Sequence, residues 1–157
     1  MSNVKEKVIK EYPTSTRWLE GRKILGVGNL ILTNKRLIFL NQVALSDMQM
    51  EALKKISEGG DLDKITDYAL DLHKSNFDVP LTSVNSARVG LYTLLPFPRP
   101  CLRVFWENPK KKGQIKSASF MFTIPLLRGL FQFEIMDVFA WVSRINTAVK
   151  QAKWVYR

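Results

Sequence analysis

The stretch that decides the fold is Gly28 to Leu40, with the sequence GNLILTNKRLIFL. Two runs of apolar and β-branched residues flank the polar pair Asn34-Lys35, and a short polar pair between two such runs is typical of the tight turn of a β-hairpin. Residues 37 to 40 are all apolar, which indicates a strand that is covered on both faces. The stretch therefore predicts a hairpin at the centre of a β-rich domain.

The same hairpin resembles the signature hairpin of GRAM and bacterial PH-like domains. Those families show a glycine, an apolar strand, Thr-Asn-Lys-Arg or a near variant, and then Leu-Ile-Phe. The matching residues here are Gly28, Thr33, Asn34, Lys35, Arg36, Leu37, Ile38 and Phe39. The resemblance implies a mainly β (α+β) fold, a PH-like bent antiparallel β-barrel with a C-terminal capping helix. Such folds host lipid binders, protein-docking modules and structural domains, so the fold alone names no ligand.

Periodicity predicts the elements around this hairpin. Residues 3 to 12 favour a short helix over a peripheral strand, and residues 18 to 27 read as the first long strand. Further strands are expected over residues 84–91, 101–106 and 116–123. From Glu134 onward, apolar residues at i, i+4, i+7 and i+11 predict the capping helix.

Residues 42 to 77 break the β pattern. Apolar residues recur there at three- and four-residue spacing on both sides of Gly59-Gly60, which predicts two short helices. We therefore expect a single domain over residues 1–157, with a helical insertion over residues 42–77. Residues 41 to 80 carry 4 basic and 8 acidic side chains, so the insertion is also the acidic part of the chain.

The rest of the chain is basic. The formal net charge over 157 residues is +10, and residues 81 to 133 carry 8 basic side chains and 1 acidic side chain. Such a body attracts anionic lipid or nucleic-acid phosphates through its long-range field, and solubility is the alternative interpretation of the charge. The charged and Pro- or Gly-containing stretch 120–142 is not expected to cross a membrane.

The sequence holds little that could perform catalysis. His73 is the one histidine and Cys101 the one cysteine, so neither a His-Cys pair nor a multi-histidine zinc site is expected. Asp63, Asp67 and Asp71 could face a metal at helical spacing, but a solvated acidic helix face is the favoured interpretation. A single cysteine and the lack of an apolar signal-peptide core after Met1 predict a cytoplasmic protein. We expect no enzyme, no cofactor and no metal.

Two apolar loops, residues 94–100 and 125–131, supply the main candidate site. Three prolines keep residues 94 to 100 out of a central strand, and loops this apolar are unusual because loops lie on the surface. If the strands after residue 84 form a meander, both loops lie at one end with the hairpin turn. The predicted membrane- or partner-docking residues are Lys35, Arg36, Leu94, Leu95, Phe97, Arg99, Leu127, Arg128 and Leu130. Apolar wedges ringed by cations suit insertion between anionic headgroups, whereas packing of these loops into a satellite core is the alternative.

A second, lysine-rich turn gives an alternative anion-binding site. It comprises Lys110, Lys111, Lys112 and Lys116. Strand alternation places this turn at the same end as the acidic insertion, which leads to the hypothesis that the insertion screens it. A solvated hairpin turn is the simpler interpretation.

These observations predict a non-catalytic peripheral module that docks to an anionic phospholipid surface or to a protein partner, at the inner face of the membrane. A homo-oligomeric scaffold that assembles through barrel edges is the alternative. Single-stranded nucleic-acid binding is more distant. It would use basic and aromatic residues on neighbouring strands, namely Arg103, Phe105, Trp106, Phe120 and Phe122, although the barrel core could claim the same aromatics.

Overall fold

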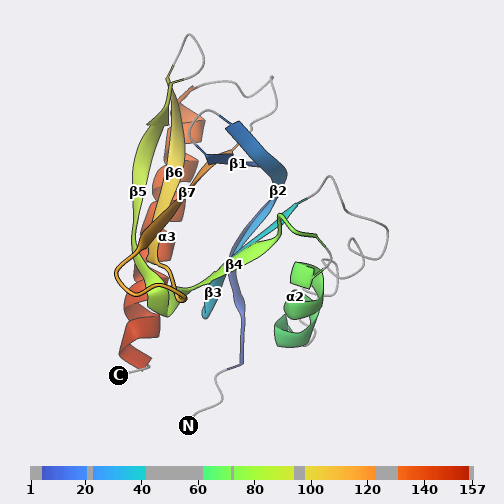
Figure 1. The fold of residues 1–157 in the computed structure, drawn as a ribbon. Helices are drawn as coiled ribbons and strands as arrows, with labels where there is room; N and C mark the ends of the chain where they lie inside the picture. The colour runs from blue at the N-terminus through green and yellow to red at the C-terminus, as the bar shows by residue number, and fades with distance from the viewer. Residues whose placement is uncertain are drawn as a thin grey trace.

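A bent antiparallel sheet and one long helix make up most of the molecule (Figure 1). The computed structural model describes residues 5–20, 23–41, 62–71, 73–93, 98–122 and 131–155. The strands are β1 Val8–Glu20, β2 Lys23–Thr33, β3 Arg36–Asn41, β4 Phe77–Pro80, β5 Val84–Tyr92, β6 Arg99–Glu107 and β7 Ile115–Phe122. The helices are α2 Leu62–Asp71, the 3-10 turn η1 Leu81–Ser83 and α3 Phe131–Val155.

The sheet is open, with the strand order β4-β3-β2-β1-β7-β6-β5, and each neighbouring pair is antiparallel. Strand β1 joins the two halves because it pairs with β2 along its length and with β7 from Thr16 to Leu19. Its register with β2 shifts between Tyr12 and Thr16. Extra residues in one strand of a pair bend it, so β1 can turn the two halves of the sheet toward each other.

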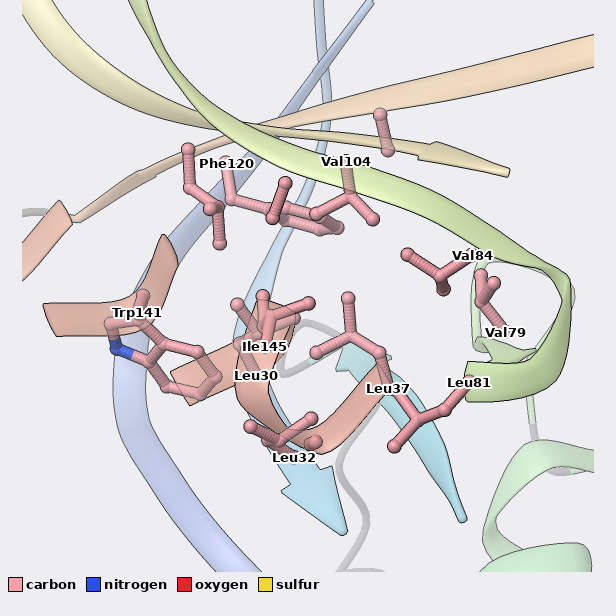
Figure 2. Close-up of a cluster of buried hydrophobic side chains, with 14 of the residues drawn as sticks. Leu30, Leu32, Leu37, Val79, Leu81, Val84, Val104, Phe120, Trp141 and Ile145 are labelled. Carbon is pink, nitrogen blue, oxygen red and sulfur yellow. The ribbon is translucent and has the colours of Figure 1, made fainter. Parts of the chain in front are cut away.

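The core lies between these two halves and under α3 (Figure 2). Leu30 of β2, Val104 of β6, Phe120 of β7 and Trp141 of α3 are each fully buried in one cluster. The alternation expected for Phe120 and Phe122 is therefore that of an inward face. Burial of this many large apolar side chains is the main stabilising term of the fold.

The signature glycine has a packing role. A Cβ atom built on Gly28 would lie 1.9 Å from the carbonyl oxygen of Leu40, on the paired strand β3. A Cβ atom cannot lie this close to a carbonyl oxygen, so the close approach of β2 and β3 at position 28 requires glycine.

Helix α3 packs along β5 and closes the edge of the sheet. The side-chain amide of Asn146 accepts a hydrogen bond from Ala87 N and donates one to Ala87 O, both at 3.0 Å. Lys153 Nζ donates to Val84 O at 2.8 Å. The helix thus satisfies backbone groups that an edge strand leaves open.

Most of the predicted elements are confirmed. The hairpin turns between Thr33 and Arg36, the three later strands differ from the predicted bounds by at most two residues, and α3 covers the expected capping helix. Helix α2 is one of the helices expected in the insertion, whose residues 42–61 lie outside the described part of the chain.

Three local predictions are wrong. The N-terminal segment is strand β1, not a helix, because residues 5 to 7 bond to Asn34 across the sheet. The predicted strand 18–27 spans two strands, since Glu20 of β1 pairs with Lys23 of β2. Phe77 begins β4 and so does not belong to the helical insertion.

Candidate functional site

The signature hairpin holds the N-terminal segment in place through Asn34. Its Oδ1 accepts a hydrogen bond from Lys7 N at 2.7 Å, and its Nδ2 donates to Lys5 O at 3.1 Å. Asn34 N also donates to Lys7 O at 3.0 Å. The polar side chain of Asn34 in the hairpin turn thus serves to hold the N-terminal segment against the sheet.

Thr33 and Arg36 engage a buried carboxylate from the same segment. Glu6 has a fully buried side chain and receives a hydrogen bond from Thr33 Oγ1 at 2.6 Å. Arg36 grips both of its oxygens, with Nε–Oε1 and Nη2–Oε2 distances of 3.1 Å. A bidentate, charge-assisted pair of this kind is among the stronger polar contacts in proteins.

Two further carboxylates complete this cluster, which we call the Arg36 corner. Arg36 Nη1 lies 2.9 Å from Asp67 Oδ1 on α2 and 3.2 Å from Asp78 Oδ2 on β4. The Arg36 side chain is 14% exposed. Burial alone would lower the pKa of Arg36, but its hydrogen bonds to Glu6, Asp67 and Asp78 outweigh burial and raise the pKa. One guanidinium among three carboxylates leaves an excess of negative charge.

Arg36 is therefore a cross-link between four parts of the chain, and its predicted role as a cation facing a membrane is not supported. The sequence prediction missed this because the three carboxylates lie 30, 31 and 42 residues away in the chain. Paired charges on a helix can be recognised in sequence by their four-residue spacing, but residues that meet only in the folded chain have no such spacing.

The predicted grouping of Lys35 and Arg36 with Arg99 is also wrong. Leu81 N donates to Lys35 O at 2.8 Å, so the hairpin turn lies beside the start of β5. Arg99 pairs with Tyr92 at the opposite end of that strand. The short strand β4, which was not predicted, adds one chain reversal, so β5 begins at the end of the molecule that carries the hairpin turn.

Six predicted docking residues lie outside the described part of the chain, so this candidate site stays a prediction. They are Leu94, Leu95, Phe97, Leu127, Arg128 and Leu130.

The chain reversal brings the hairpin turn to the end of the molecule that carries the lysine-rich β6–β7 turn (Figure 1). Val84, at the start of β5, pairs with Trp106, and Trp106 pairs with Lys116. The bond from Lys153 to Val84 O brings the C-terminal turn of α3 to the same place. We call this region the lysine end. Its lysines are Lys5, Lys7, Lys35, Lys110, Lys111, Lys112, Lys116, Lys150 and Lys153.

The lysine end also presents apolar side chains to solvent. Trp154 is 84% exposed, Val155 57% and Ile115 52%. A tryptophan this exposed contributes little to the core of the molecule. Trp154 lies beside exposed lysines, which makes the lysine end a candidate docking surface.

The acidic insertion contacts the basic body at the Arg36 corner through Asp67. Its helix α2 also packs Ala69 against Ile31, Ile38 and Leu40 on the outer face of β2 and β3. Screening of the β6–β7 turn by the insertion stays a prediction.

The described residues provide no group of His, Cys, Asp and Glu that could hold a metal ion. His73 Nδ1 accepts a hydrogen bond from Ser75 N at 3.1 Å, and Asp67 binds Arg36. Cys101 is buried, and burial raises the pKa of its thiol despite the nearby Arg103. A thiol in this state is a poor nucleophile at neutral pH.

The five residues considered for nucleic-acid binding separate into two groups. Phe120 and Phe122 are buried, and Trp106 packs against the same core. Arg103 and Phe105 alternate with core residues and lie on the outer face of β6. The predicted five-residue platform does not exist, but two of its members share an outer face.

No protein-family model matches this chain, and no curated protein matches its sequence. In the part of the chain that the structure describes, no helix has the length and apolar character needed to cross a bilayer.

Proposed function

We propose that this chain is a PH-like, non-catalytic module that docks to an anionic phospholipid surface through its lysine end. A mainly β fold with a C-terminal helix is consistent with the PH-like barrel that the resemblance of the hairpin implies, and the sheet itself is open. The observation that carries the docking proposal is the convergence of exposed lysines and the exposed Trp154 at one end of the fold.

The two kinds of side chain suit two layers of a membrane surface. Lysines attract the anionic headgroups, and each contributes about 1 kcal/mol near such a surface. Tryptophan favours the boundary between headgroups and hydrocarbon because its ring is apolar and its N–H is polar. The Arg36 corner withholds its own cation from this contact because the guanidinium is already paired.

Co-sedimentation with vesicles tests the proposal. The chain should bind vesicles of phosphatidylcholine with phosphatidylserine, and should bind pure phosphatidylcholine weakly. The triple variant Lys110→Ala, Lys111→Ala, Lys112→Ala should lose about 100-fold in affinity, since three surface cations at ~1 kcal/mol each are removed. Its melting temperature should stay unchanged because the three side chains are exposed.

A matched variant controls for net charge. Lys23→Ala, Lys74→Ala and Arg144→Ala remove three exposed cations that lie outside the lysine end. This control should bind more tightly than the lysine-turn variant. Equal losses in the two triple variants would show a general electrostatic effect and contradict docking through the lysine end.

Fluorescence of Trp154 gives a second, independent measurement. Trp141 is fully buried, and Trp18 and Trp106 pack against the core, so Trp154 is the described tryptophan that a bilayer can reach. Anionic vesicles should shift the emission to shorter wavelength, and Trp154→Phe should abolish the shift. A shift that survives this substitution would contradict contact of Trp154 with the membrane.

The apolar loops remain a second predicted docking surface. Leu95→Asp with Leu127→Asp should abolish vesicle binding if those leucines enter the bilayer, because a charge there is costly. Loss of folding in this variant would assign the leucines to the core. Full binding by a folded variant would leave the lysine end as the docking surface.

The scaffold alternative has a distinct signature in light scattering. Assembly through the β5 edge has less support because Asn146 and Lys153 already occupy backbone groups there. The exposed side chains of Met136 and Phe139 on α3 offer another contact surface for a second copy. A mass several times 18.1 kDa, independent of concentration, would favour the scaffold.

A further inference from the structure

Arginines gather on the outer face of the second half of the sheet, away from the lysine end. On β5, β6 and β7 this face is opposite the core, because Ala87, Val104 and Ala118 alternate inward. We call the outer surface the arginine face. Its exposed arginines are Arg88 and Arg103, whereas Arg17 and Arg99 are half-buried on the same face beside the buried cluster of Leu19, Tyr92 and Met121.

The register places two of these cations side by side on neighbouring strands. Arg88 and Arg103 are direct partners on β5 and β6, and Ser119 of β7 is the next residue across. Arg17 of β1 pairs with Met121 on the far side of β7. Since adjacent strands lie about 4.8 Å apart, Arg88 and Arg103 are close neighbours. Arg17 is two strands away from Arg103, and the buried Leu19 and Met121 lie on the outer face between them.

One aromatic side chain lies beside this pair of arginines. The guanidinium carbon of Arg88 lies 5.7 Å from the ring centroid of Phe105, within cation–π range. Ser117 lies opposite Phe105, and Ser119 lies opposite Arg103. The small serines leave the aromatic ring and the arginine without a bulky cross-strand neighbour on β7.

Gly90 helps to set the position of Arg103. A Cβ atom on Gly90 would lie 2.6 Å from Arg103 Nε and 2.7 Å from its Cδ. The guanidinium also donates from Nη2 to Leu91 O at 3.4 Å. The arginine therefore lies flat along the sheet, in space that a larger residue at position 90 would fill.

Among the described residues, no carboxylate forms an ion pair with Arg17, Arg88 or Arg103. Glu107 shares the outer face, but its Oε1 accepts a hydrogen bond from Gly113 N at 2.8 Å within its own turn. This contrasts with Arg36, whose charge three carboxylates compensate. The cations of Arg88 and Arg103 are exposed and can meet an external anion.

We infer that the arginine face binds single-stranded nucleic acid without sequence specificity. Planar guanidiniums suit phosphate oxygens, which they can contact in a bidentate manner, and a flat aromatic ring suits an unpaired base. Arg88 and Arg103, side by side on β5 and β6 with Phe105 next to them, offer contacts to phosphate and base within one patch. This inference goes beyond the proposed membrane docking and uses a different surface.

Fluorescence anisotropy with a labelled oligo(dT) of about twelve nucleotides tests the inference, since single domains bind strands of roughly this length. The chain should bind the oligonucleotide, with an affinity that falls as salt rises. Arg88→Ala with Arg103→Ala should weaken binding about tenfold and lower the salt slope by about 1.4, because two phosphate contacts are lost.

Two variants test the geometry at constant charge. Phe105→Leu keeps an apolar side chain but removes the ring, and should weaken binding about fivefold or more, the effect of one lost base stack. Gly90→Ala should displace Arg103 and weaken binding severalfold. Neither should alter vesicle binding, which keeps this inference separate from the membrane proposal.

The control is Lys74→Ala with Arg144→Ala, which removes two exposed cations elsewhere. Equal weakening by this pair and by the arginine pair would overturn the inference, because it would show that the net positive charge of the chain attracts the oligonucleotide without a specific site. Undiminished binding by a folded Phe105→Leu variant, together with equal affinity for poly-glutamate, would overturn the assignment to nucleic acid. Melting temperatures of all variants establish that they fold.

Discussion

The Arg36 corner and the lysine end lie close together, yet their cations have opposite surroundings. Arg36 has a side chain that is 14% exposed and contacts three carboxylates, whereas Lys110, Lys111 and Lys112 are exposed on a turn. A buried guanidinium requires nearby anions because desolvation of an unpaired charge is costly. An exposed ammonium keeps its water and remains able to attract another molecule. Position in the fold, not residue type, therefore separates a structural cation from a binding one.

The largest expected effect is on stability. Arg36→Ala should lower the free energy of unfolding by about 3 kcal/mol, since it leaves the buried Glu6 carboxylate unpaired. Urea denaturation measures this change. The control Lys111→Ala, at an exposed position of the lysine end, should change stability by less than about 0.5 kcal/mol. Equal small changes in both variants would remove the distinction between the two regions.

The next largest effect is the different salt dependence expected for the Arg36 corner and the lysine end. Raising NaCl from about 0.05 M to 0.5 M shortens the screening length from roughly 14 Å to 4 Å, so vesicle binding through exposed lysines should fall tenfold or more. The stability difference between the wild-type chain and Arg36→Ala should change little, because a buried pair is screened less. A stability difference that vanished in salt would mean that Arg36 behaves as a surface cation.

A smaller effect is expected for Asp67, whose side chain is 68% exposed. Asp67→Asn should cost less than about 1 kcal/mol, in line with exposed ion pairs. The measurement is again urea denaturation, with Arg36→Ala as the background for a double-mutant cycle. Coupling close to that expected for a buried pair would show that α2 is held more firmly than its exposure indicates.

The smallest effect concerns Glu11, a half-buried carboxylate of β1 whose pKa is raised by burial. A raised pKa in the folded state means that the ionised form destabilises the fold above the unfolded pKa of about 4.3 and has no effect well below it. Glu11→Gln should therefore raise the melting temperature at pH 7 by about one to two degrees, and leave it unchanged near pH 3. A rise of the same size at both values of pH would rule out ionisation as the cause.

How much the sequence could predict depended on the range of the interactions involved. The hairpin at Gly28 to Leu40 and helix α3 were predictable because their patterns repeat over neighbouring residues. The strand β4 has four residues and no periodic signal of its own, so it was missed, and with it the end of the molecule at which β5 begins. The Arg36 corner was missed because its four members are distant in the chain and meet only in the folded state.

The candidate sites show the same dependence. Composition revealed an excess of basic residues, but only the register of β5, β6 and β7 shows that Arg88 and Arg103 are neighbours. The aromatic residues were ambiguous in sequence because Phe105 and Phe120 occur in similar local patterns. Side chains alternate between the two faces of a strand. Phe105 follows the core residue Val104 and so lies on the outer face, whereas Phe120 is itself in the core.

The amide of Asn146 has a consequence for how the chain is made. Because α3 follows every described strand in the sequence, a ribosome completes β5 more than fifty residues before it reaches Asn146, which lies 59 residues after Ala87. During this interval the backbone of β5 is an open template for pairing with another nascent chain. We therefore expect the vulnerable period for aggregation to end only when α3 has left the exit tunnel and docked.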